Sequence, residues 1–259
     1  MEILKANEAF KKSDGKMEFS YVKYFVRQDG VLYYGKWKNR HQAPETLEQL
    51  DEVRQIQTED RGPEISSTWS VIYIKKPSLL SYADGSDLEK RILREVAVCE
   101  VLRSNPHPNI ASYYGCQETH GRVSGLCFKR YNSTLLEKVN PQGLSKDRFR
   151  SSGREHVDEA IIASLDGIFQ GIKHLHSLGL VHNDINPTNI MFDEYGTPIL
   201  IDFDSCRKVG ESLRDTETKR TYQWHDPQTD TALEKNDLDA LEELRIWLIG
   251  SAQDMFLFS

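Results

Sequence analysis

The chain has 259 residues, 38% of them hydrophobic and 28% charged, so it can bury a core and does not have the composition of a disordered protein. Its net charge of −7, without a basic cluster, argues against a nucleic-acid binder. The N-terminus is charged from its second residue, and no segment approaches the roughly 20 apolar residues that cross a bilayer. We expect an intracellular protein, cytoplasmic or nuclear, that binds neither nucleic acid nor membranes. Its scattered cysteines predict free thiols in a reducing compartment: Cys99, Cys116, Cys127 and Cys206.

The first half of the chain predicts β-strands. Residues 18–38 place aromatic and β-branched residues on both sides of the turn sequence RQDG, which is typical of a hairpin. The polar stretch that follows is compatible with a short helix over residues 45–57. Residues 69–77 predict a strand that Pro77 ends, because proline has no N–H for a sheet ladder, and residues 125–131 predict another strand.

Residues 86–103 predict a helix with an apolar stripe, and Glu95 lies inside that stripe. A carboxylate on an apolar face is costly unless a cation meets it. Two interpretations are open at this point. Glu95 reaches solvent from the edge of the stripe, or it pairs with a cation from another element.

The second half of the chain predicts helices. Residues 158–178 predict a long helix and residues 238–249 a final apolar one, and the long helix carries a stripe of core residues: Ile161, Leu165, Ile168, Ile172 and Leu175. Strands in the first half and helices in the second predict an α+β fold, with a β-rich lobe followed by an α-rich lobe.

A short hairpin between these helices gathers polar side chains. NIMF and PILID predict two strands around a turn that carries Gly196. Because the open ends of a hairpin lie side by side, Asn189 and Asp202 should come together, with Asp184 before them in a loop that Pro187 keeps from being helical. Such oxygen ligands suit Mg²⁺, which shares its shell with phosphates, and one carboxylate is left to act as a base. The spacing His-x-Asp-x-x-x-x-Asn, followed by Asp-Phe, disfavours a mere polar turn.

These motifs resemble those of the eukaryotic protein kinase domain, whose catalytic loop reads HRDLKPEN and whose metal motif reads DFG. HNDINPTN at 182–189 and IDFDSC at 201–206 resemble in particular the short kinase-like proteins common in fungi. HPNI at 107–110 and LHSLGLVHND at 175–184 fit the order and spacing of the family. The resemblance covers about residues 69–249 and implies a bilobal kinase-like fold that uses ATP and Mg²⁺.

The resemblance implies roles for five residues by position. Asp184 would orient or deprotonate the acceptor hydroxyl. Asn189 and Asp202 would hold Mg²⁺ on the nucleotide phosphates. Lys75 would contact the α- and β-phosphates and Glu95 would pair with it, which supplies the cation that the helix requires.

The choice of lysine depends on strand register. Lys76 is the rival of Lys75, and a slip of one residue exchanges the two faces of the strand. We favour Lys75, which shares its face with Tyr73 and Val71. The resemblance also implies that His182 braces the catalytic loop, and that Asp237 anchors this loop from the helix below.

Several positions depart from the family pattern. No glycine-rich phosphate loop precedes the lysine strand, since the turn RQDG has one glycine, so nucleotide would bind less tightly. Asn183 stands where the family has the arginine that grips a phosphorylated activation loop, and Asn186 stands where it has a lysine near the transferred phosphoryl group. Asp204 replaces the glycine of DFG, and its carboxylate either repels the phosphates or contacts the metal.

The asparagine at position 183 predicts constitutive activity. Phosphate at Thr216, Thr218 or Thr221 would find no arginine beside the catalytic aspartate, so Thr→Glu changes there should alter activity only a few-fold. A nearby basic residue such as Arg207 could serve as a substitute receptor and overturn this expectation.

The C-terminal part is expected to be short. DPQ at 226–228 stands where the family has APE, and the sequence stops at 259, before the helix whose arginine pairs with that glutamate. We expect an N-terminal extension with the first strands of the N-lobe over 1–67, the remainder of the N-lobe over 68–131, and a truncated C-lobe over 132–259 that ends near the central helix.

Three functions are open from the sequence. The first is ATP- and Mg²⁺-dependent phosphoryl transfer to Ser/Thr hydroxyls of an unknown protein partner. The second is a pseudokinase, a nucleotide-binding or scaffold module, which Asn186, Asp204 and the missing glycine-rich loop favour. The third is a small-molecule phosphotransferase, against which HPNI and the DPQ segment count.

Overall fold

The computed structural model describes residues 1–13, 16–56, 72–76, 88–119, 122–214, 218–251 and 253–258. Its Cα positions divide into two compact units, each described here by itself. The first unit comprises Met1–Gly62, Lys76–Leu88 and Glu118–Ser124, and the second comprises Pro63–Lys75, Glu89–Gln117 and Gly125–Ser259. The fold is α+β, with antiparallel strands before the helical part, as the sequence predicts.

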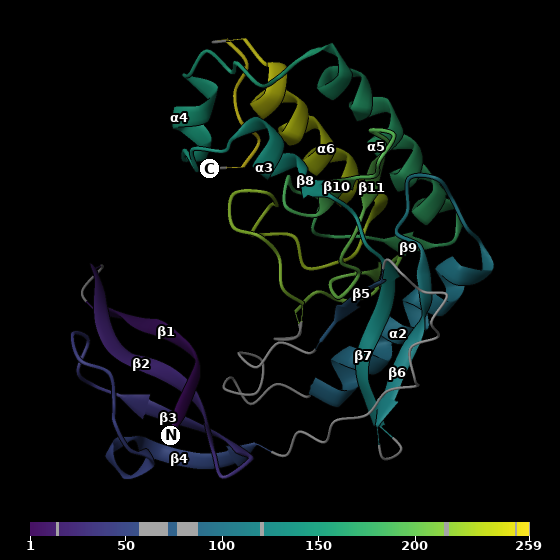
Figure 1. Ribbon diagram of the computed structural model, residues 1–259. Helices are drawn as coiled ribbons and strands as arrows, with labels where there is room; N and C mark the ends of the chain where they lie inside the picture. The colour runs from purple at the N-terminus through teal and green to yellow at the C-terminus, as the bar shows by residue number, and fades with distance from the viewer. Residues whose placement is uncertain are drawn as a thin grey trace. The chain divides into compact units, whose positions relative to one another are not determined.

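The first unit contains a four-stranded antiparallel sheet, shown in purple and blue in Figure 1. Its strands follow chain order: β1 (Glu2–Ser13), β2 (Lys16–Gln28), β3 (Val31–Trp37) and β4 (Asp51–Ile56). Asp29 and Gly30 join β2 to β3 with φ values of 52° and 79°, the left-handed conformation that a tight two-residue hairpin turn requires. The predicted hairpin is therefore confirmed, whereas β1 was not anticipated.

The short helix expected over residues 45–57 is wrong. Only Leu47–Gln49 forms a single 3₁₀ turn, and β4 follows it at once. The polar composition of this stretch is overridden by pairing along β3, where Leu32 lies opposite Ile56. Leu50 and Ile56 are both buried in the apolar clusters of the sheet, a gain that a local helix would not provide.

The second unit contains most of a three-stranded sheet in the order β5–β7–β6, accompanied by helix α2 (Figure 1). The bounds are Ile72–Lys75 for β5, Arg122–Lys129 for β7, Tyr113–Thr119 for β6 and Leu88–Ser104 for α2. The predicted strands and helix are present where they are described, and residues 69–71, 77, 86 and 87 lie outside the described residues. Strand β6 was not predicted.

The helical part surrounds the short hairpin β10–β11. Helix α5 packs against α6 and β11 (Figure 1), and β10 pairs with β11 as the predicted hairpin, with Ile190 opposite Leu200. The remaining elements are α3 (Leu135–Val139), α4 (Lys146–Arg150), α5 (Glu159–Ser177), α6 (Glu234–Ile249), β8 (Ser133–Thr134), β9 (Leu180–Val181), β10 (Ile190–Phe192), β11 (Pro198–Leu200) and β12 (Arg207–Lys208).

Helix α5 supports the hairpin because its sequence allows a close approach. Asp158 caps its start by accepting a hydrogen bond from the backbone N–H of Ile161 at 2.8 Å. A Cβ atom at Gly167 would come within 2.7 Å of Pro198, which is too close for any other residue without rearrangement. The glycine therefore lets α5 lie directly against the strand that leads to Asp202.

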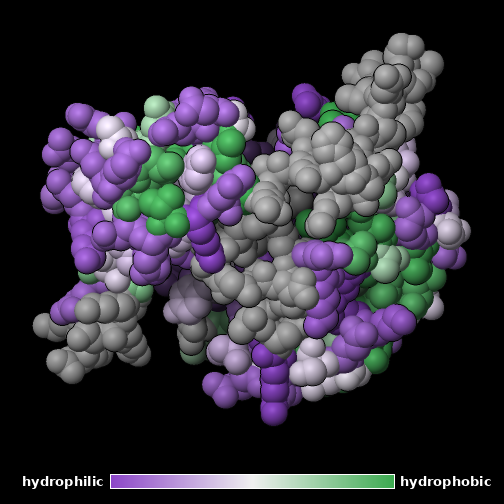
Figure 2. Space-filling view, turned by 90° about the horizontal axis from the view of Figure 1, so that it is seen from below, coloured by the Kyte–Doolittle hydropathy of each residue, from purple (hydrophilic) through white to green (hydrophobic). Residues whose placement is uncertain are grey.

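The face drawn in Figure 2 is largely hydrophilic outside the grey atoms, with smaller hydrophobic patches between the polar regions. Among the residues that the structure describes, no helix has the length and apolar character that a bilayer crossing requires. The four cysteines, which are all described, carry free thiols as expected.

Candidate active site

The 182–189 loop is held from below by Asp237, at the start of α6. The Asp237 carboxylate is fully buried and accepts hydrogen bonds from the backbone N–H groups of His182 and Asn183, both at 2.8 Å. His176 of α5 lies 2.9 Å from the same carboxylate. The anchor that the resemblance implied for Asp237 is therefore present, and it ties the loop to two helices.

His182 braces the loop through both of its ring nitrogens. One ring nitrogen lies 3.0 Å from the carbonyl oxygen of Ile201, and the other accepts the backbone N–H of Asp184 at 3.3 Å. Both nitrogens are thus used within the loop and the hairpin. The structural role expected for His182 agrees with these contacts.

Asp184 is positioned by the loop and by the 218–229 segment. Its Oδ1 accepts the backbone N–H of Thr221 at 2.7 Å, while Oδ2 accepts the Thr221 hydroxyl at 3.1 Å and Asn189 Nδ2 at 2.9 Å. Burial raises the pKa of Asp184 above its ordinary value, and the hydrogen bonds from Thr221 oppose that rise. These donors fix the carboxylate without placing a cation against it.

Lys75 lies between two carboxylates of the second unit. Its Nζ is 2.6 Å from Glu95 Oε1 and 2.6 Å from Asp202 Oδ1, so the predicted contact with Glu95 is confirmed. The side chain of Lys75 is 23% exposed, whereas Lys76 is exposed to solvent. The register that favours Lys75 follows from its pairing with Leu126 of β7.

Burial and neighbouring charges shift the pKa values of this cluster in opposite directions. Burial alone would lower the pKa of Lys75, but the carboxylates of Glu95, Asp202 and Asp204 raise it above its ordinary value. Burial raises the pKa of Glu95, against the pull of Lys75. Burial also acts to raise the pKa of Asp202, but the Lys75 charge prevails and holds it below its usual value, which keeps Asp202 ionised.

Asn189 and Asp202 lie at the open end of the hairpin, as the sequence predicts. The backbone N–H of Ile201 donates to the carbonyl oxygen of Asn189 at 3.0 Å, which brings the two strand ends together. Asn189 uses Nδ2 for its bonds to Asp184, so these bonds do not use its side-chain oxygen. Asp202 adopts φ 64°, a left-handed conformation that aspartate tolerates better than most residues. An ionised carboxylate and an amide oxygen are ligands that suit Mg²⁺.

No group of three or more His, Cys, Asp or Glu side chains within the described ranges is arranged to hold a metal. The expected ligand set is smaller: it comprises Asp202 and Asn189 and would leave the remaining positions of a magnesium ion to phosphate oxygens and water. The residues therefore fit the ion as a partner of bound nucleotide.

Asn183, at the position of the expected arginine, is buried and fully engaged. Its Nδ2 donates to the carbonyl oxygens of Val181 and Ser205 at 3.0 and 3.2 Å, and its Oδ1 accepts from Asn236 at 3.0 Å. The backbone has φ 63°, which asparagine adopts more readily than arginine. A neutral amide thus fills the position without a buried charge.

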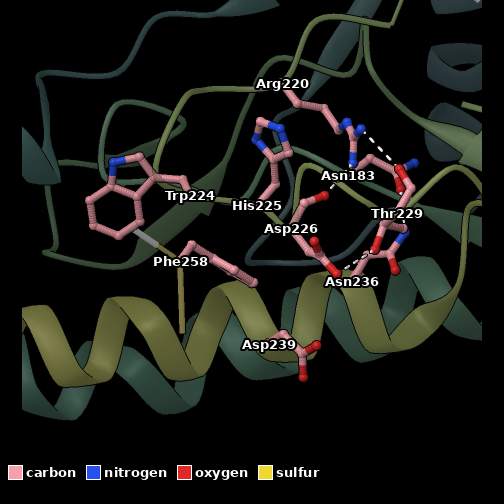
Figure 3. Close-up of a pocket in the computed structure, with 9 residues that line it drawn as sticks. All are labelled: Asn183, Arg220, Trp224, His225, Asp226, Thr229, Asn236, Asp239 and Phe258. Carbon is pink, nitrogen blue, oxygen red and sulfur yellow. Dashed lines mark hydrogen bonds between the residues drawn. The ribbon is translucent and has the colours of Figure 1, made fainter. Parts of the chain in front are cut away.

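A polar hollow lies beside Asn183 (Figure 3). Arg220 crosses it and donates to the carbonyl oxygens of Asp226 and Thr229 at 3.3 and 3.0 Å, while His225 bonds the carbonyl oxygen of Thr221 at 2.8 Å. The hollow is lined by Asn183, Arg220, Trp224, His225, Asp226, Thr229, Asn236, Asp239 and Phe258. These hydrogen bonds lie within the 218–229 segment and fix its conformation, including that of the DPQ turn, beside the loop.

Thr221 contacts the catalytic loop, although the sequence pointed to it only as a candidate phosphorylated threonine. Besides its bonds to Asp184, its hydroxyl accepts a hydrogen bond from Asn186 Nδ2 at 3.1 Å. Asn186 therefore occupies the position of the family's lysine with a neutral donor. Only the hydroxyl itself, shortly before the DPQ turn, offered a signal for Thr221 in the sequence.

Known proteins resemble this chain over the same region. The profile of the protein kinase domain matches residues 66–250 and so starts after β4. A MAP kinase kinase kinase of Schizosaccharomyces pombe is 28% identical over 145 residues, which are 56% of this chain and 9% of that protein. A MAP kinase kinase kinase of Saccharomyces cerevisiae is 29% identical over 136 residues, which are 51% and 8%. The serine/threonine-protein kinase Tao of Drosophila melanogaster is 26% identical over 185 residues, which are 71% and 16%.

The chain thus matches less than a fifth of the length of each of these relatives. The family profile, in contrast, covers well over half of the chain and includes Lys75, the 182–189 loop and the hairpin. The chain therefore belongs to the protein kinase domain family.

Proposed function

We propose that the protein transfers the γ-phosphoryl group of ATP to a serine or threonine hydroxyl of a protein substrate. The observation that carries the proposal is the position of Lys75, 2.6 Å from both Glu95 and Asp202. This arrangement presents an ammonium group and an ionised carboxylate together, as a nucleotide with its metal requires. The names of the relatives, serine/threonine kinases among them, support the class of acceptor.

Each residue has a defined part in the proposed reaction. Lys75 contacts the α- and β-phosphates, and Glu95 keeps Lys75 in place. Asn189 and Asp202 would hold Mg²⁺, which neutralises phosphate charge when bound. Asp184 orients the acceptor hydroxyl and takes its proton. The hydroxyl oxygen bonds to the γ-phosphorus as the bond to the β–γ bridging oxygen breaks, and ADP leaves.

A pseudokinase is the second candidate, and a specific contact favours it. Asn186 places a neutral amide on Thr221 where a lysine would bring positive charge to the transferred group. The turn of Asp29 and Gly30, which was the candidate phosphate-loop turn before the lysine strand, lies in the β1–β4 sheet and supplies a single glycine. Such a protein would bind nucleotide and act as a scaffold with little transfer. A small-molecule acceptor finds no comparable support.

Thermal-shift titration with ATP and Mg²⁺, joined to an assay of ADP formation with a degenerate Ser/Thr peptide library, tests the proposal. Asp202→Asn should abolish the magnesium-dependent shift. Asp184→Asn, its matched neutral control, should keep the shift and lose turnover about 100-fold or more, because general-base catalysis contributes that much. A shift without peptide phosphorylation in the wild type would favour the pseudokinase, and equal shifts in wild type and Asp202→Asn would refute the metal assignment.

A further inference from the structure

Asp204, which follows Asp202 and Phe203, makes an ion pair with helix α2. Arg91 Nη2 lies 3.2 Å from Asp204 Oδ2, and the two side chains are only 8% and 25% exposed. The other carboxylate oxygen, Oδ1, accepts the Ser205 hydroxyl at 3.1 Å. From the sequence, the Asp204 carboxylate could either repel the phosphates or contact the metal. In the structure it pairs with the guanidinium of Arg91.

Arg91 and Glu95 lie one helical turn apart on the same face of α2. Both are buried, whereas Leu93 between them is 52% exposed, so the pair defines the inward face of the helix. Glu95 reaches the 202–204 stretch through Lys75, and Arg91 reaches it directly at Asp204. Two separate ionic links thus join one helix face to one short loop.

The second link also balances charge. Glu95, Asp202 and Asp204 place three carboxylates around the single ammonium of Lys75, and the charge of Asp204 acts on both Lys75 and Glu95. Arg91 adds the second cation. Without Arg91, the half-buried carboxylate of Asp204 would oppose phosphate binding and would disfavour an ionised Glu95.

We propose that Arg91 and Asp204 are positioning residues whose ion pair holds α2 with Glu95 against Lys75. The ion pair does not depend on phosphorylation of the 218–229 segment. The charge of Arg91 also compensates that of Asp204, which would otherwise repel the nucleotide phosphates. The catalytic consequence rests on the proposed function, but the structural consequence does not. The alternative is that Asp204 contacts the metal ion, and the experiment must distinguish this role from the ion pair with Arg91.

Hydrogen exchange of α2 peptides in the full chain measures the structural consequence without any need for activity. Arg91→Gln should speed α2 exchange at least tenfold, because it removes the ion pair that ties α2 to Asp204. Arg91→Lys, which keeps the charge, should stay within about threefold of wild type. Adding Asp204→Asn to Arg91→Gln should slow α2 exchange at least threefold relative to Arg91→Gln alone. Arg103→Gln is the matched control, because Arg103 forms an exposed pair with Glu100 on the same helix.

If the protein transfers phosphate, the same variants should order kcat/KM in the same way, with Arg91→Gln at least tenfold below wild type. If it transfers none, the proposed function fails while the exchange data still decide the ion pair. Unchanged α2 exchange in Arg91→Gln, equal to that of Arg103→Gln, would overturn the inference. A second result would also overturn it: Asp204→Asn lowers the affinity for Mg²⁺ equally in the wild type and in Arg91→Gln. That result would identify Asp204 as a metal contact.

Discussion

Thr221 and Thr218 are two hydroxyl residues of the 218–229 segment with different surroundings. Thr221 contacts Asp184, whereas the Thr218 hydroxyl accepts a hydrogen bond from Arg207 at 2.6 Å. Arg207, named from the sequence as a substitute phosphate receptor, therefore lies beside one of the candidate threonines, and Thr216 lies outside the described residues. The expectation that a Thr→Glu change alters activity only a few-fold therefore has to be stated separately for Thr218 and Thr221.

Glutamate substitutions test this division. Thr221→Glu should abolish transfer, because a second carboxylate would lie against Asp184 in place of the hydroxyl that donates to it. Thr218→Glu should leave turnover within a few-fold, since Arg207 already donates to the unmodified hydroxyl. Steady-state kinetics of both variants beside Thr221→Val and Thr218→Val controls measure the difference. Activation of about a hundredfold by Thr218→Glu, worth some 2.7 kcal/mol of barrier, would show that Arg207 reads charge at this position.

His107, in the HPNI turn, makes stability depend on pH. Its ring stacks on that of His174 with centroids 4.7 Å apart, and Nδ1 accepts the backbone N–H of Asn109 at 3.2 Å. Burial lowers the pKa of His107, and the neighbouring His174 lowers it further. The folded protein therefore binds fewer protons than the unfolded chain below about pH 6.5, and stability is lost as pH falls from there through the folded pKa.

The variant His107→Asn keeps an acceptor for the Asn109 N–H but does not titrate. We expect its free energy of unfolding to fall less steeply between pH 6.5 and pH 5, by up to about 1.4 kcal/mol per pH unit. Urea denaturation at several pH values measures the slope. His225, whose pKa burial also lowers, should leave a residual slope in both proteins. A matching slope in wild type and His107→Asn, with the exposed His156→Asn as control, would contradict the assignment.

At the scale of elements, the end of the chain is bound to α4 and α6 by a buried ion pair. Lys146 of α4 and Glu243 of α6 form this pair, with side-chain exposures of 5% and 0%. Glu243 also accepts the backbone N–H of Leu257 at 2.6 Å, and Lys146 donates to the carbonyl oxygens of Gln223 and Phe258 at 2.5 and 3.2 Å. One pair therefore connects two helices, the 218–229 segment and residues 253–258.

Removing one partner of this pair should be far more costly than removing both. Burial already lowers the pKa of Lys146, so an isolated charge there is strongly disfavoured. Lys146→Met and Glu243→Leu should each lower the free energy of unfolding by about 3–5 kcal/mol, and the double variant should lose much less than their sum. Urea unfolding followed by tryptophan fluorescence measures the cycle. Lys235→Ala, which removes an exposed i,i+4 pair with Asp239, should change stability by under about 1 kcal/mol.

At the scale of the whole molecule, the two compact units have separate apolar cores. Val22, Tyr24, Val26 and Leu50 form one cluster of the β1–β4 sheet. Ile172 of α5 belongs to the second unit and is fully buried. Separate cores predict that the units lose structure in separate steps.

Cavity-forming variants should assign those steps. Leu50→Ala and Ile172→Ala should each cost about 2–5 kcal/mol in their own unit. We expect Leu50→Ala to reduce hydrogen-exchange protection in β1–β4 and to leave any ATP-induced thermal shift intact. Ile172→Ala should leave protection in β1–β4 intact and reduce any ATP-induced thermal shift. Loss of protection in both units from either variant would show that the chain unfolds as one cooperative body.

The sequence alone was sufficient for the features that depend on local pattern. The β2–β3 turn, the α5 stripe and the β10–β11 hairpin each arise from residues close together in the chain, so their periodicity and turn residues predict them. The order of Asp184, Asn189 and Asp202 is also local, because one hairpin brings them together. The resemblance to the protein kinase domain and the candidate site residues could therefore be read from the sequence before any coordinates.

Only the tertiary structure decided the features that join distant residues. Polar composition suggested a helix over 45–57, but pairing with β3 made Asp51–Ile56 a strand. The choice between Lys75 and Lys76 required the register against β7. The contact of Asp204 with Arg91 joins residues 113 positions apart, which no local pattern indicates. Strand pairing and buried ion pairs depend on which surfaces meet, and in a folded chain that is set by the packing of the whole core.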